Sequence, residues 1–253
     1  MSEFADSLRQ GVHAMGLDLE PVAFQRLVTH QSLLTKWMRR INLTAITEPR
    51  DMVDRLYLDC LVVCAHLQGA DRLHDVGSGA GFPGLVIKAV MPHIQVTLTE
   101  ARHKRVSFLK QAAREMGLDQ GLDIRWQRIG WEREQEDQAA AEKGGREGSP
   151  DGDPDSGRHM GWPEVISRAT FPPKEWLRRG TTLLLPKGRI WVMAGHALEG
   201  ESQAVQQEAS EWNSLLEELG LERAGEWPYR LPFCGLERRL LAFRKSCAIH
   251  GNT

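Results

Sequence analysis

Four regularly spaced glycines form the segment of this chain best suited to chemistry. They lie in the run Asp75-Val-Gly-Ser-Gly-Ala-Gly-Phe-Pro-Gly84. Glycine adopts positive φ angles at little cost and lets a ligand lie directly against backbone N–H groups. Residues 72–76 are typical of a short buried strand, and residues 85–90 of the start of a helix, whose N-terminus favours polar or anionic groups. The segment therefore predicts a nucleotide-binding turn between a strand and a helix.

The glycine run fits two nucleotide-binding patterns at once. Gly79 to Gly84 is a G-x-G-x-x-G, the dinucleotide fingerprint. Asp75 to Gly81 instead resembles the acidic-x-G-x-G-x-G pattern of S-adenosylmethionine-dependent methyltransferases. Asp75 suits a cationic amino-acid group and would repel a pyrophosphate, and Pro83 removes a backbone donor that phosphate would need. Both features favour the methyl donor. Glu100, which ends the next apolar run, would bind the ribose hydroxyls of either ligand.

Composition excludes some classes of protein. The chain has 253 residues, 41% of them hydrophobic, which is enough for one large domain or one domain with an appendage. No apolar run is long enough to span a bilayer, and residues 1–6 lack the features of a signal peptide. Cys60, Cys64, Cys234 and Cys247 include no C-x-x-C pair, and the nine histidines show no metal spacing. We therefore expect a reduced, cytoplasmic protein with no bound metal and no membrane association.

Charge is unevenly distributed along the chain. The formal net charge is −2. Residues 132–158 hold nine acidic and four basic side chains, a charge of −5, which leaves +3 for the remainder. The same stretch has no Val, Ile, Leu or Phe, so it cannot bury enough apolar surface to offset its ordering entropy. We expect a disordered acidic insertion at 132–160, and a mildly basic folded part that is compatible with RNA binding.

Hydrophobic periodicity divides the chain into two parts. Residues 3–67 carry apolar residues at helical spacing throughout, which predicts a helical cap over residues 1–68. On one of these helices Arg55 and Asp59 are four residues apart, so we expect them to form an ion pair. After the cap, short apolar runs alternate with helical stretches up to residue 219, which is typical of a parallel sheet with helices on both faces.

The last part of the chain follows a different pattern. Two apolar runs, near 225–231 and 239–243, have a turn but no helix between them. This spacing predicts an antiparallel hairpin at the edge of the sheet. The second predicted unit therefore covers residues 69–245, followed by a flexible tail at 246–253.

Beyond the glycine run, further segments resemble those of one enzyme family. The family is that of the bacterial 16S ribosomal RNA guanine-N7 methyltransferases, known as ribosomal RNA small subunit methyltransferase G or glucose-inhibited division protein B. The acidic insertion has no counterpart in the family pattern. The matching segments occur in family order and are Trp37-Met-Arg-Arg-Ile-Asn-Leu-Thr44, Arg55-Leu-Tyr-Leu-Asp-Cys60, Lys104-Arg-Val-Ser-Phe-Leu109, Ile166-Ser-Arg-Ala169, Leu185-Pro-Lys-Gly188 and Glu237-Arg-Arg-Leu240.

The resemblance implies a fold, a cofactor and a set of site residues. The fold would be that of a class I S-adenosylmethionine-dependent methyltransferase, a Rossmann-like α/β fold with a mostly parallel sheet and an antiparallel edge hairpin, preceded by the helical segment. The substrate would be 16S rRNA or the 30S subunit. Separately, no unpaired apolar helix face is evident in the sequence, so we expect a monomer. Residues implied to bind S-adenosylmethionine are Asp75, Gly77, Ser78, Gly79, Gly81, Phe82, Glu100, Ile129, Gly130 and Arg168. Residues implied to bind RNA are Arg128, Lys187 and Arg238, with Arg168 and Lys187 acting at the reacting atoms.

The chemistry of the target atom agrees with this resemblance. Guanine N7 has a free lone pair, so it can attack a sulfonium methyl group without a general base and needs only positioning and electrostatic complementarity. Methylation of an exocyclic amine would call for an Asn/Asp-Pro-Pro-aromatic loop, whereas Thr170-Phe-Pro-Pro-Lys174 differs at its first and last positions. Methylation of pyrimidine C5 would call for a cysteine in the same loop, and none is present there.

Two alternative functions remain open from the sequence. The G-x-G-x-x-G would also serve a dinucleotide-binding oxidoreductase. A catalytically inactive RNA-binding relative is the other, because Gly130 stands where the family usually has an acid.

Overall fold

The computed structural model describes residues 2–128, 161–195 and 203–246. The predicted acidic insertion, at 132–160, lies outside these ranges, as does the predicted tail after residue 246. Within the described ranges, no helix is long and apolar enough to cross a membrane.

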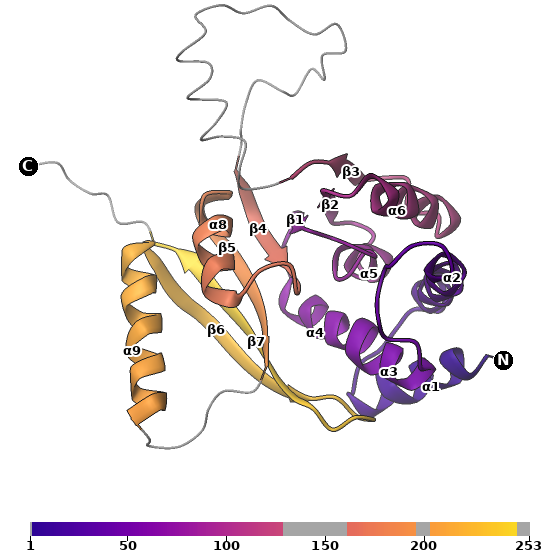
Figure 1. Ribbon diagram of the computed structural model, residues 1–253, viewed down its shortest axis with the longest axis horizontal. Helices are drawn as coiled ribbons and strands as arrows, with labels where there is room; N and C mark the ends of the chain where they lie inside the picture. Colours follow the sequence, from indigo (N-terminus) through magenta and orange to yellow (C-terminus); the bar gives the residue numbers. More distant parts are fainter. Residues whose placement is uncertain (1, 129–160, 196–202, 247–253) are drawn as a thin grey trace, which may run out of the picture.

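A mixed sheet of seven strands forms the centre of the described structure (Figure 1). Its order is β3-β2-β1-β4-β5-β7-β6. The first five strands pair in parallel, and β7 pairs antiparallel with both β5 and β6. The predicted α/β sheet with an antiparallel edge hairpin is therefore confirmed. The strands are β1 (Arg72–Val76), β2 (Gln95–Glu100), β3 (Leu122–Trp126), β4 (Trp162–Ser167), β5 (Leu184–Gly195), β6 (Leu221–Arg230) and β7 (Glu237–Lys245).

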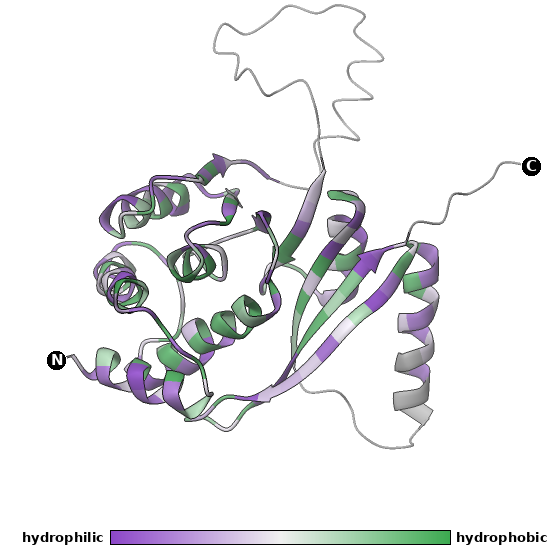
Figure 2. Cartoon of the chain, turned by 180° about the vertical axis from the view of Figure 1, so that it is seen from behind, coloured by the Kyte–Doolittle hydropathy of each residue, from purple (hydrophilic) through white to green (hydrophobic). Residues whose placement is uncertain are grey.

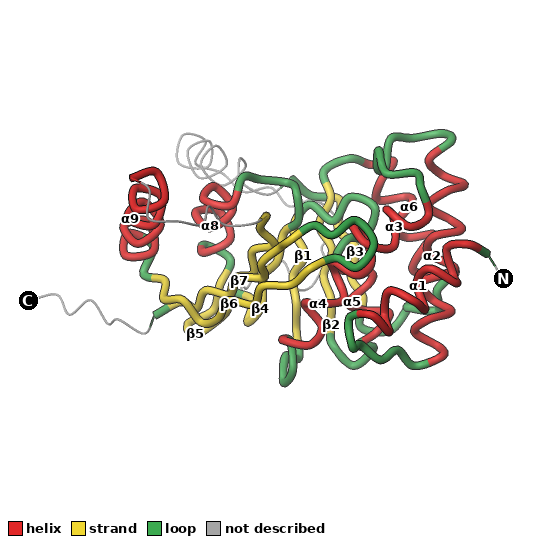
Figure 3. The backbone as a smooth tube through the Cα atoms, turned by 90° about the horizontal axis from the view of Figure 1, so that it is seen from below, coloured by secondary structure: helices red, strands yellow, loops and turns green. Residues whose placement is uncertain are grey.

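Helices cover both faces of this sheet because neighbouring strand residues point to opposite faces. Val165 and Ile190 pack in one apolar cluster with α8 (Pro173–Thr181) and α9 (Gln203–Glu218). Ile166 and Trp191, the next residues along the same strands, belong to a second cluster with the helices of the N-terminal half. The strands accordingly lie between α8 and α9 and the remaining helices (Figure 3). Helix α9 carries both apolar and polar residues (Figure 2), as expected for a helix on the surface of a sheet.

The helices of the second cluster come from the N-terminal half and from the first two crossovers of the sheet. Buried residues of α1, α2 and α4 share one apolar cluster with α5 and β2, so the N-terminal helices have no separate core. These helices are α1 (Glu3–Ala14), α2 (Pro21–Met38), α3 (Pro49–Met52), η1 (Val53–Leu58), α4 (Asp59–His66), α5 (Gly84–Val90) and α6 (His103–Glu115).

The expectation that residues 3–67 are helical throughout is wrong at two places. Residues 15–20 connect α1 to α2, and residues 39–48 form a longer connection before α3. Pro49 takes the first position of α3, where proline lacks only an N–H that the helix would leave unpaired. Thr44 Oγ1 accepts a hydrogen bond from Ile46 N at 3.1 Å, a local turn that competes with helix. The connection at 39–48 therefore stays irregular and is free to line the site described below.

Candidate active site

The glycine turn joins β1 to α5 at the carboxyl edge of the sheet, where the strand order reverses between β1 and β4. Ligands of open α/β sheets bind at such a switch point. Gly77 N and Ser78 N both donate to Thr99 O, at 2.8 and 3.0 Å, which ties the turn to β2. Gly77 has φ +75°, and a Cβ there would lie 2.3 Å from Thr170 Oγ1. Glycine is thus required at this position for two reasons: the backbone has a positive φ, and a side chain would collide with Thr170, which follows β4.

Asp75 supports the turn from behind. Its side chain is fully buried, and Oδ2 accepts a hydrogen bond from Gly84 N at 2.9 Å, the first residue of α5. Burial raises the pKa of this carboxyl to about 7, against the lowering effect of the Gly84 N–H. Asp75 does not line the cavity in front of the turn. The structure therefore shows this acid holding the helix start against the strand end, and its direct contact with the donor stays a prediction.

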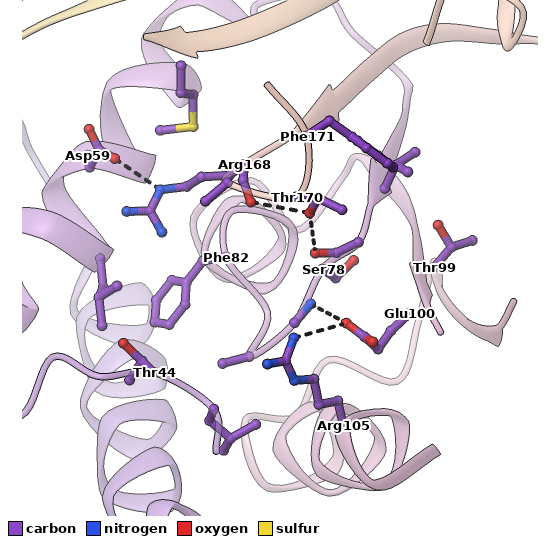
Figure 4. A pocket seen from close by; sticks show the side chains of 18 of the residues that line it. Thr44, Asp59, Ser78, Phe82, Thr99, Glu100, Arg105, Arg168, Thr170 and Phe171 are labelled. Atoms are coloured by element: carbon purple, nitrogen blue, oxygen red, sulfur yellow. Dashed lines mark hydrogen bonds and ion pairs between the residues drawn. The ribbon is translucent and has the colours of Figure 1, made fainter. Parts of the chain in front are cut away.

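Glu100 lies at the cavity wall, at the end of β2. Its Oε2 accepts from Gly79 N at 2.9 Å (Figure 4). Its Oε1 accepts from Arg102 N at 2.8 Å. Arg105 Nη1 is 3.8 Å from Oε2, and Arg105 Nη2 donates to Asn42 O in the connection after α2. Each carboxylate oxygen retains a second lone pair. Backbone N–H groups therefore orient Glu100, and its oxygens can still accept hydrogen bonds from the hydroxyl groups of a ligand in the cavity.

A continuous cavity of about 1020 Å³ lies in front of the turn. Pockets for single drug-sized ligands have volumes of roughly 300–1,000 Å³, so this one is large enough for a nucleoside donor and part of a second molecule. Among the predicted site residues, the structure brings together at its wall Gly77, Ser78, Gly79, Phe82, Glu100, Arg128, Arg168 and Arg238. Gly81 lies within the turn behind this wall. Ile129 and Gly130, also expected to bind the donor, lie outside the described residues.

The cavity has a strongly cationic wall. Its described lining includes two carboxylates, Asp59 and Glu100, and no histidine, lysine or cysteine. Against these two acids stand seven arginines, which are Arg55, Arg102, Arg105, Arg128, Arg168, Arg179 and Arg238. Clefts lined by one sign of charge concentrate ligands of the opposite sign. The arrangement therefore favours an anionic partner such as a phosphate backbone.

Asp59 organises the half of the cavity that faces away from the glycine turn. Its side chain is 1% exposed, and its carboxylate accepts a hydrogen bond from Arg168 Nε at 3.0 Å (Figure 4). The same carboxylate accepts Arg238 Nη2 at 3.2 Å and Tyr229 Oη at 2.6 Å. Burial, and then Asp59 itself, raise the pKa of the Tyr229 hydroxyl. One buried acid thus orients two guanidinium groups that were predicted separately as donor and RNA contacts.

The expected ion pair between Arg55 and Asp59 is replaced by these long-range contacts. A turn of π-helix, η1, precedes Asp59, and Asp59 N donates to Asp54 O in place of the usual partner four residues back. The carbonyl of Arg55 accepts a hydrogen bond from Arg168 Nη2. Turns of π-helix often occur at functional sites. Here the turn contacts Arg168 through the carbonyl of Arg55.

The residue after Arg168 has a strained backbone. Ala169 has φ +56°, which is uncommon for a residue with a side chain and costs about 1–3 kcal/mol. The next residue, Thr170, donates from Oγ1 to Gly77 O at 3.1 Å. The chain is therefore bent back over the glycine turn, and this bend keeps Arg168 beside the donor half of the cavity.

His30 holds the N-terminal helices against the glycine turn. Its Nε2 is 2.9 Å from Ala80 O and its Nδ1 is 2.9 Å from Tyr57 Oη. A carbonyl only accepts, so Nε2 carries the proton and Nδ1 accepts from the tyrosine. Burial lowers the pKa of His30 to about 4, which keeps the ring neutral. The sequence gives no spacing signal for this contact.

Lys187 lies far from the cavity, contrary to its expected place beside the donor. Lys187 lies near the start of β5, which begins at Leu184. Trp162 pairs with Leu184, and Ser167, at the carboxyl edge, pairs with Val192. Lys187 therefore lies towards the amino edge of the sheet, exposed and at φ +65°, beside an irregularity in the register. The cavity end of β5 reads Met193-Ala-Gly195 and carries no lysine, so a role for Lys187 at the reacting atoms is not supported.

The geometry fits S-adenosylmethionine better than a metal or a pyrophosphate. A carboxylate at the end of β2 faces the cavity beside a turn of glycines. The turn N–H groups of Gly77, Ser78, Gly81 and Phe82 donate to backbone carbonyls of the protein itself. Phosphate would need those N–H groups, whereas ribose hydroxyls need the carboxylate. Among the described residues, no group of three or more His, Cys, Asp or Glu side chains could hold a metal ion.

Solved structures show the same fold at low sequence identity. An O-methyltransferase from Bacillus cereus, in complex with S-adenosylhomocysteine, superposes with a TM-score of 0.53 at 13% identity, over 93% of this chain and 96% of that one. The O-methyltransferase TomG from Streptomyces achromogenes, in complex with S-adenosylmethionine, gives 0.52 at 14% identity, over 97% and 100%. These likenesses confirm the class I methyltransferase fold.

Sequence relatives show the family. The family model for rRNA small subunit methyltransferase G matches residues 23–140. A ribosomal RNA small subunit methyltransferase G from Neisseria meningitidis is 41% identical over 117 residues, 46% of this chain and 56% of that protein. The protein of the same name from Myxococcus xanthus is 32% identical over 249 residues, which cover 96% of this chain and 98% of the relative. Together with the glycine turn and Glu100, this near full-length match shows that the chain belongs to the ribosomal RNA small subunit methyltransferase G family.

Proposed function

We propose that the chain transfers a methyl group from S-adenosylmethionine to N7 of a guanine in the 530 loop of 16S rRNA. The observation that carries the proposal is the joining of two half-sites in one cavity, in a chain of this family. One half is the glycine turn with Glu100, and the other is the arginine pair on Asp59. A dinucleotide oxidoreductase is not supported, because the family is one of methyltransferases.

The lining of the cavity suits methyl transfer to a ring nitrogen with a free lone pair. S-adenosylmethionine supplies an electrophilic methyl group when bound. Guanine N7 needs no deprotonation before it attacks, and the described lining offers no histidine, lysine or cysteine as a base or covalent nucleophile. The two acids are engaged with backbone N–H groups or arginines. The chain's contribution is therefore orientation and electrostatic complementarity.

The two halves have separate tasks in this proposal. Glu100 and the glycine turn hold the ribose and amino-acid part of the donor. Arg168, which the resemblance assigns to the donor, shares the carboxylate of Asp59 with Arg238, so both arginines are assigned here to the RNA beside the target base. That base must leave its stack to enter the cavity. The connection at 39–48 contributes Leu43 and Thr44 to the wall around that base. We further propose that the protein acts as a monomer in the cytoplasm.

The decisive experiment measures transfer of labelled methyl groups to 30S particles that lack the modification, with naked 16S rRNA in parallel. Borohydride-aniline cleavage, which is selective for 7-methylguanine, then maps the labelled position. A single cleavage in the 530 loop is expected. No incorporation into either substrate, with donor binding intact by titration, would refute the proposal and favour a binding-only relative. Binding of NADH in place of the donor would favour the oxidoreductase.

A further inference from the structure

The indole of Trp126 is exposed beside the donor half of the cavity. Its side chain is 66% exposed, although every other described tryptophan is at least partly buried. Trp126 is the last residue of β3 and pairs with Glu100 at the end of β2, so it stands at the carboxyl edge of the sheet. Gln127 and Arg128, which follow it, line the cavity, whereas Trp126 itself does not. The indole thus lies on the outer rim of the site.

The orientation of this indole is fixed without its face being covered. Trp126 Nε1 donates to Ala101 O at 3.0 Å. The ring of His103 meets it edge-to-face, with centroids 5.1 Å apart and planes at 79°. The hydrogen bond uses the polar edge of the indole and leaves much of its apolar surface in solvent. A side chain held in this way has little rotamer freedom left to lose when a planar ligand stacks on it.

Three exposed cations lie close in the sequence to Trp126 or to the residues that contact its indole, Ala101 and His103. Arg102 and Lys104, at the start of α6, and Arg128, after β3, are all exposed. In the part of the chain that the structure describes, no ion pair is found for any of these three side chains. Arg125, by contrast, pairs with Asp123 on the same strand. A rigid aromatic ring among uncompensated cations is the pattern with which proteins bind single-stranded nucleic acid, by stacking on bases and by contacts to phosphates.

We propose that Trp126 is a stacking platform for an unpaired base of the RNA substrate, with Arg102, Lys104 and Arg128 binding the adjoining phosphates. This inference rests on the proposed function, since it places a second contact on the RNA whose target base enters the cavity. An RNA strand that crosses the rim at Trp126 would reach the cavity wall through Arg128, which belongs to both surfaces. A protein partner is less well matched, because charged side chains are depleted at the centre of protein interfaces.

The test compares Trp126→Ala, Trp126→Leu and Trp126→Phe with the wild-type chain. Three quantities are measured for each: the Kd for a labelled 530-loop RNA, the KM for 30S particles, and the Kd for S-adenosylmethionine. Trp126→Ala and Trp126→Leu should weaken RNA binding by about 10-fold, because both lose the aromatic face, and Trp126→Phe should stay within threefold of wild type. Donor binding should not change. Val22→Ala on α2, whose side chain is 62% exposed, is the matched control for loss of a surface apolar group.

Each other outcome has a definite meaning. RNA affinity unchanged in Trp126→Ala, or equal in Trp126→Leu and Trp126→Phe, would overturn the stacking platform. A weaker Kd for the donor would also overturn it, since Trp126 would then support the cofactor site. A higher KM for 30S particles with unchanged binding of naked RNA would point to a ribosomal protein and overturn the assignment to RNA. If the wild type binds RNA through Trp126 but transfers no methyl group, the platform stands and the proposed function fails.

Discussion

Replacing Asp59 by asparagine tests whether one buried carboxylate organises the RNA half of the cavity. The substitution keeps the shape of the side chain but removes a negative charge that lies within 3.2 Å of both Arg168 and Arg238. Two guanidinium groups would then face each other without a counter-charge. Tyr229 would also lose the ionised acceptor that it contacts at 2.6 Å.

The size of the effect follows from the burial of the partners. Removing one partner of a buried ion pair costs about 3–5 kcal/mol. Asp59 is 1% exposed, but the side chains of Arg168 and Arg238 are 16% and 25% exposed, so solvent screening favours the lower end, about 3 kcal/mol. A domain with a stability of roughly 5–15 kcal/mol should survive this loss. Without Asp59 the two arginine side chains would be mobile and would have to be ordered each time a complex forms. We expect this cost to lower kcat/KM for 30S particles by roughly 100-fold.

The assay needs a control that separates folding from function. Asp54→Asn lies five residues earlier and is equally buried, but the carboxylate of Asp54 accepts from Phe233 N and Cys234 N, at 2.9 and 2.7 Å, and does not line the cavity. It should destabilise the chain in denaturant unfolding without a comparable loss of kcat/KM. The Kd for S-adenosylmethionine should stay within threefold in both variants. A folded Asp59→Asn protein with near wild-type kcat/KM, or an equal loss in Asp54→Asn, would refute the reasoning.

Three further predictions follow from the same geometry. Glu100→Gln should raise the Kd for S-adenosylmethionine at least 10-fold, since an amide group would face the N–H of Gly79 or Arg102 in place of an acceptor; isothermal titration would measure this, and unchanged affinity would exclude Glu100 from the donor site. Lys187→Ala should leave kcat/KM within twofold, because the lysine lies towards the amino edge of the sheet, and a large loss in the methylation assay would contradict that placement. His30 has its pKa lowered to about 4 from 6.5, so the unfolded chain binds the proton more readily and the stability that His30 contributes is lost as pH falls from 6.5 towards 4, by up to about 3 kcal/mol. His30→Gln should therefore show a smaller fall in unfolding free energy over this range, and an identical pH slope would refute the buried neutral ring.

Features that depend on contiguous residues were predictable from the sequence. The glycine turn follows from four glycines between an apolar run and a helix start, and the positive φ at Gly77, Gly79 and Gly81 agrees with that reading. The alternation of strands and helices is likewise predicted by the local spacing of hydrophobic residues. Even here the start of β5 at Leu184 is not evident from the sequence, because Pro186-Lys-Gly188 has the composition of a turn. The register with β4 shifts at this segment and resumes at Arg189, and because the strand already begins at Leu184, Lys187 lies towards its amino end.

Contacts between distant segments were not predictable in the same way. Asp59 meets Arg168 across 109 residues and Arg238 across 179. Helical spacing instead suggested Arg55, four residues away, as its partner. The preference for a local pair is only about 0.2–0.5 kcal/mol, which is smaller than the free energy of a buried pair completed by several hydrogen bonds. The choice of partner therefore depends on which segments the fold brings together, and a single sequence carries no direct record of that.

The charge of the chain makes the same point about function. A formal net charge of −2 argues against a polyanionic partner, yet the described wall of the cavity carries seven arginines and two carboxylates. The fold brings these arginines together from helices, connections and strand ends between Arg55 and Arg238. Electrostatic attraction falls off over about 8–10 Å at physiological ionic strength, so an RNA responds to the local surface and not to the total. The binding of 16S RNA by an acidic protein is therefore consistent with its structure, and raising the salt concentration should weaken that binding as phosphate contacts are lost.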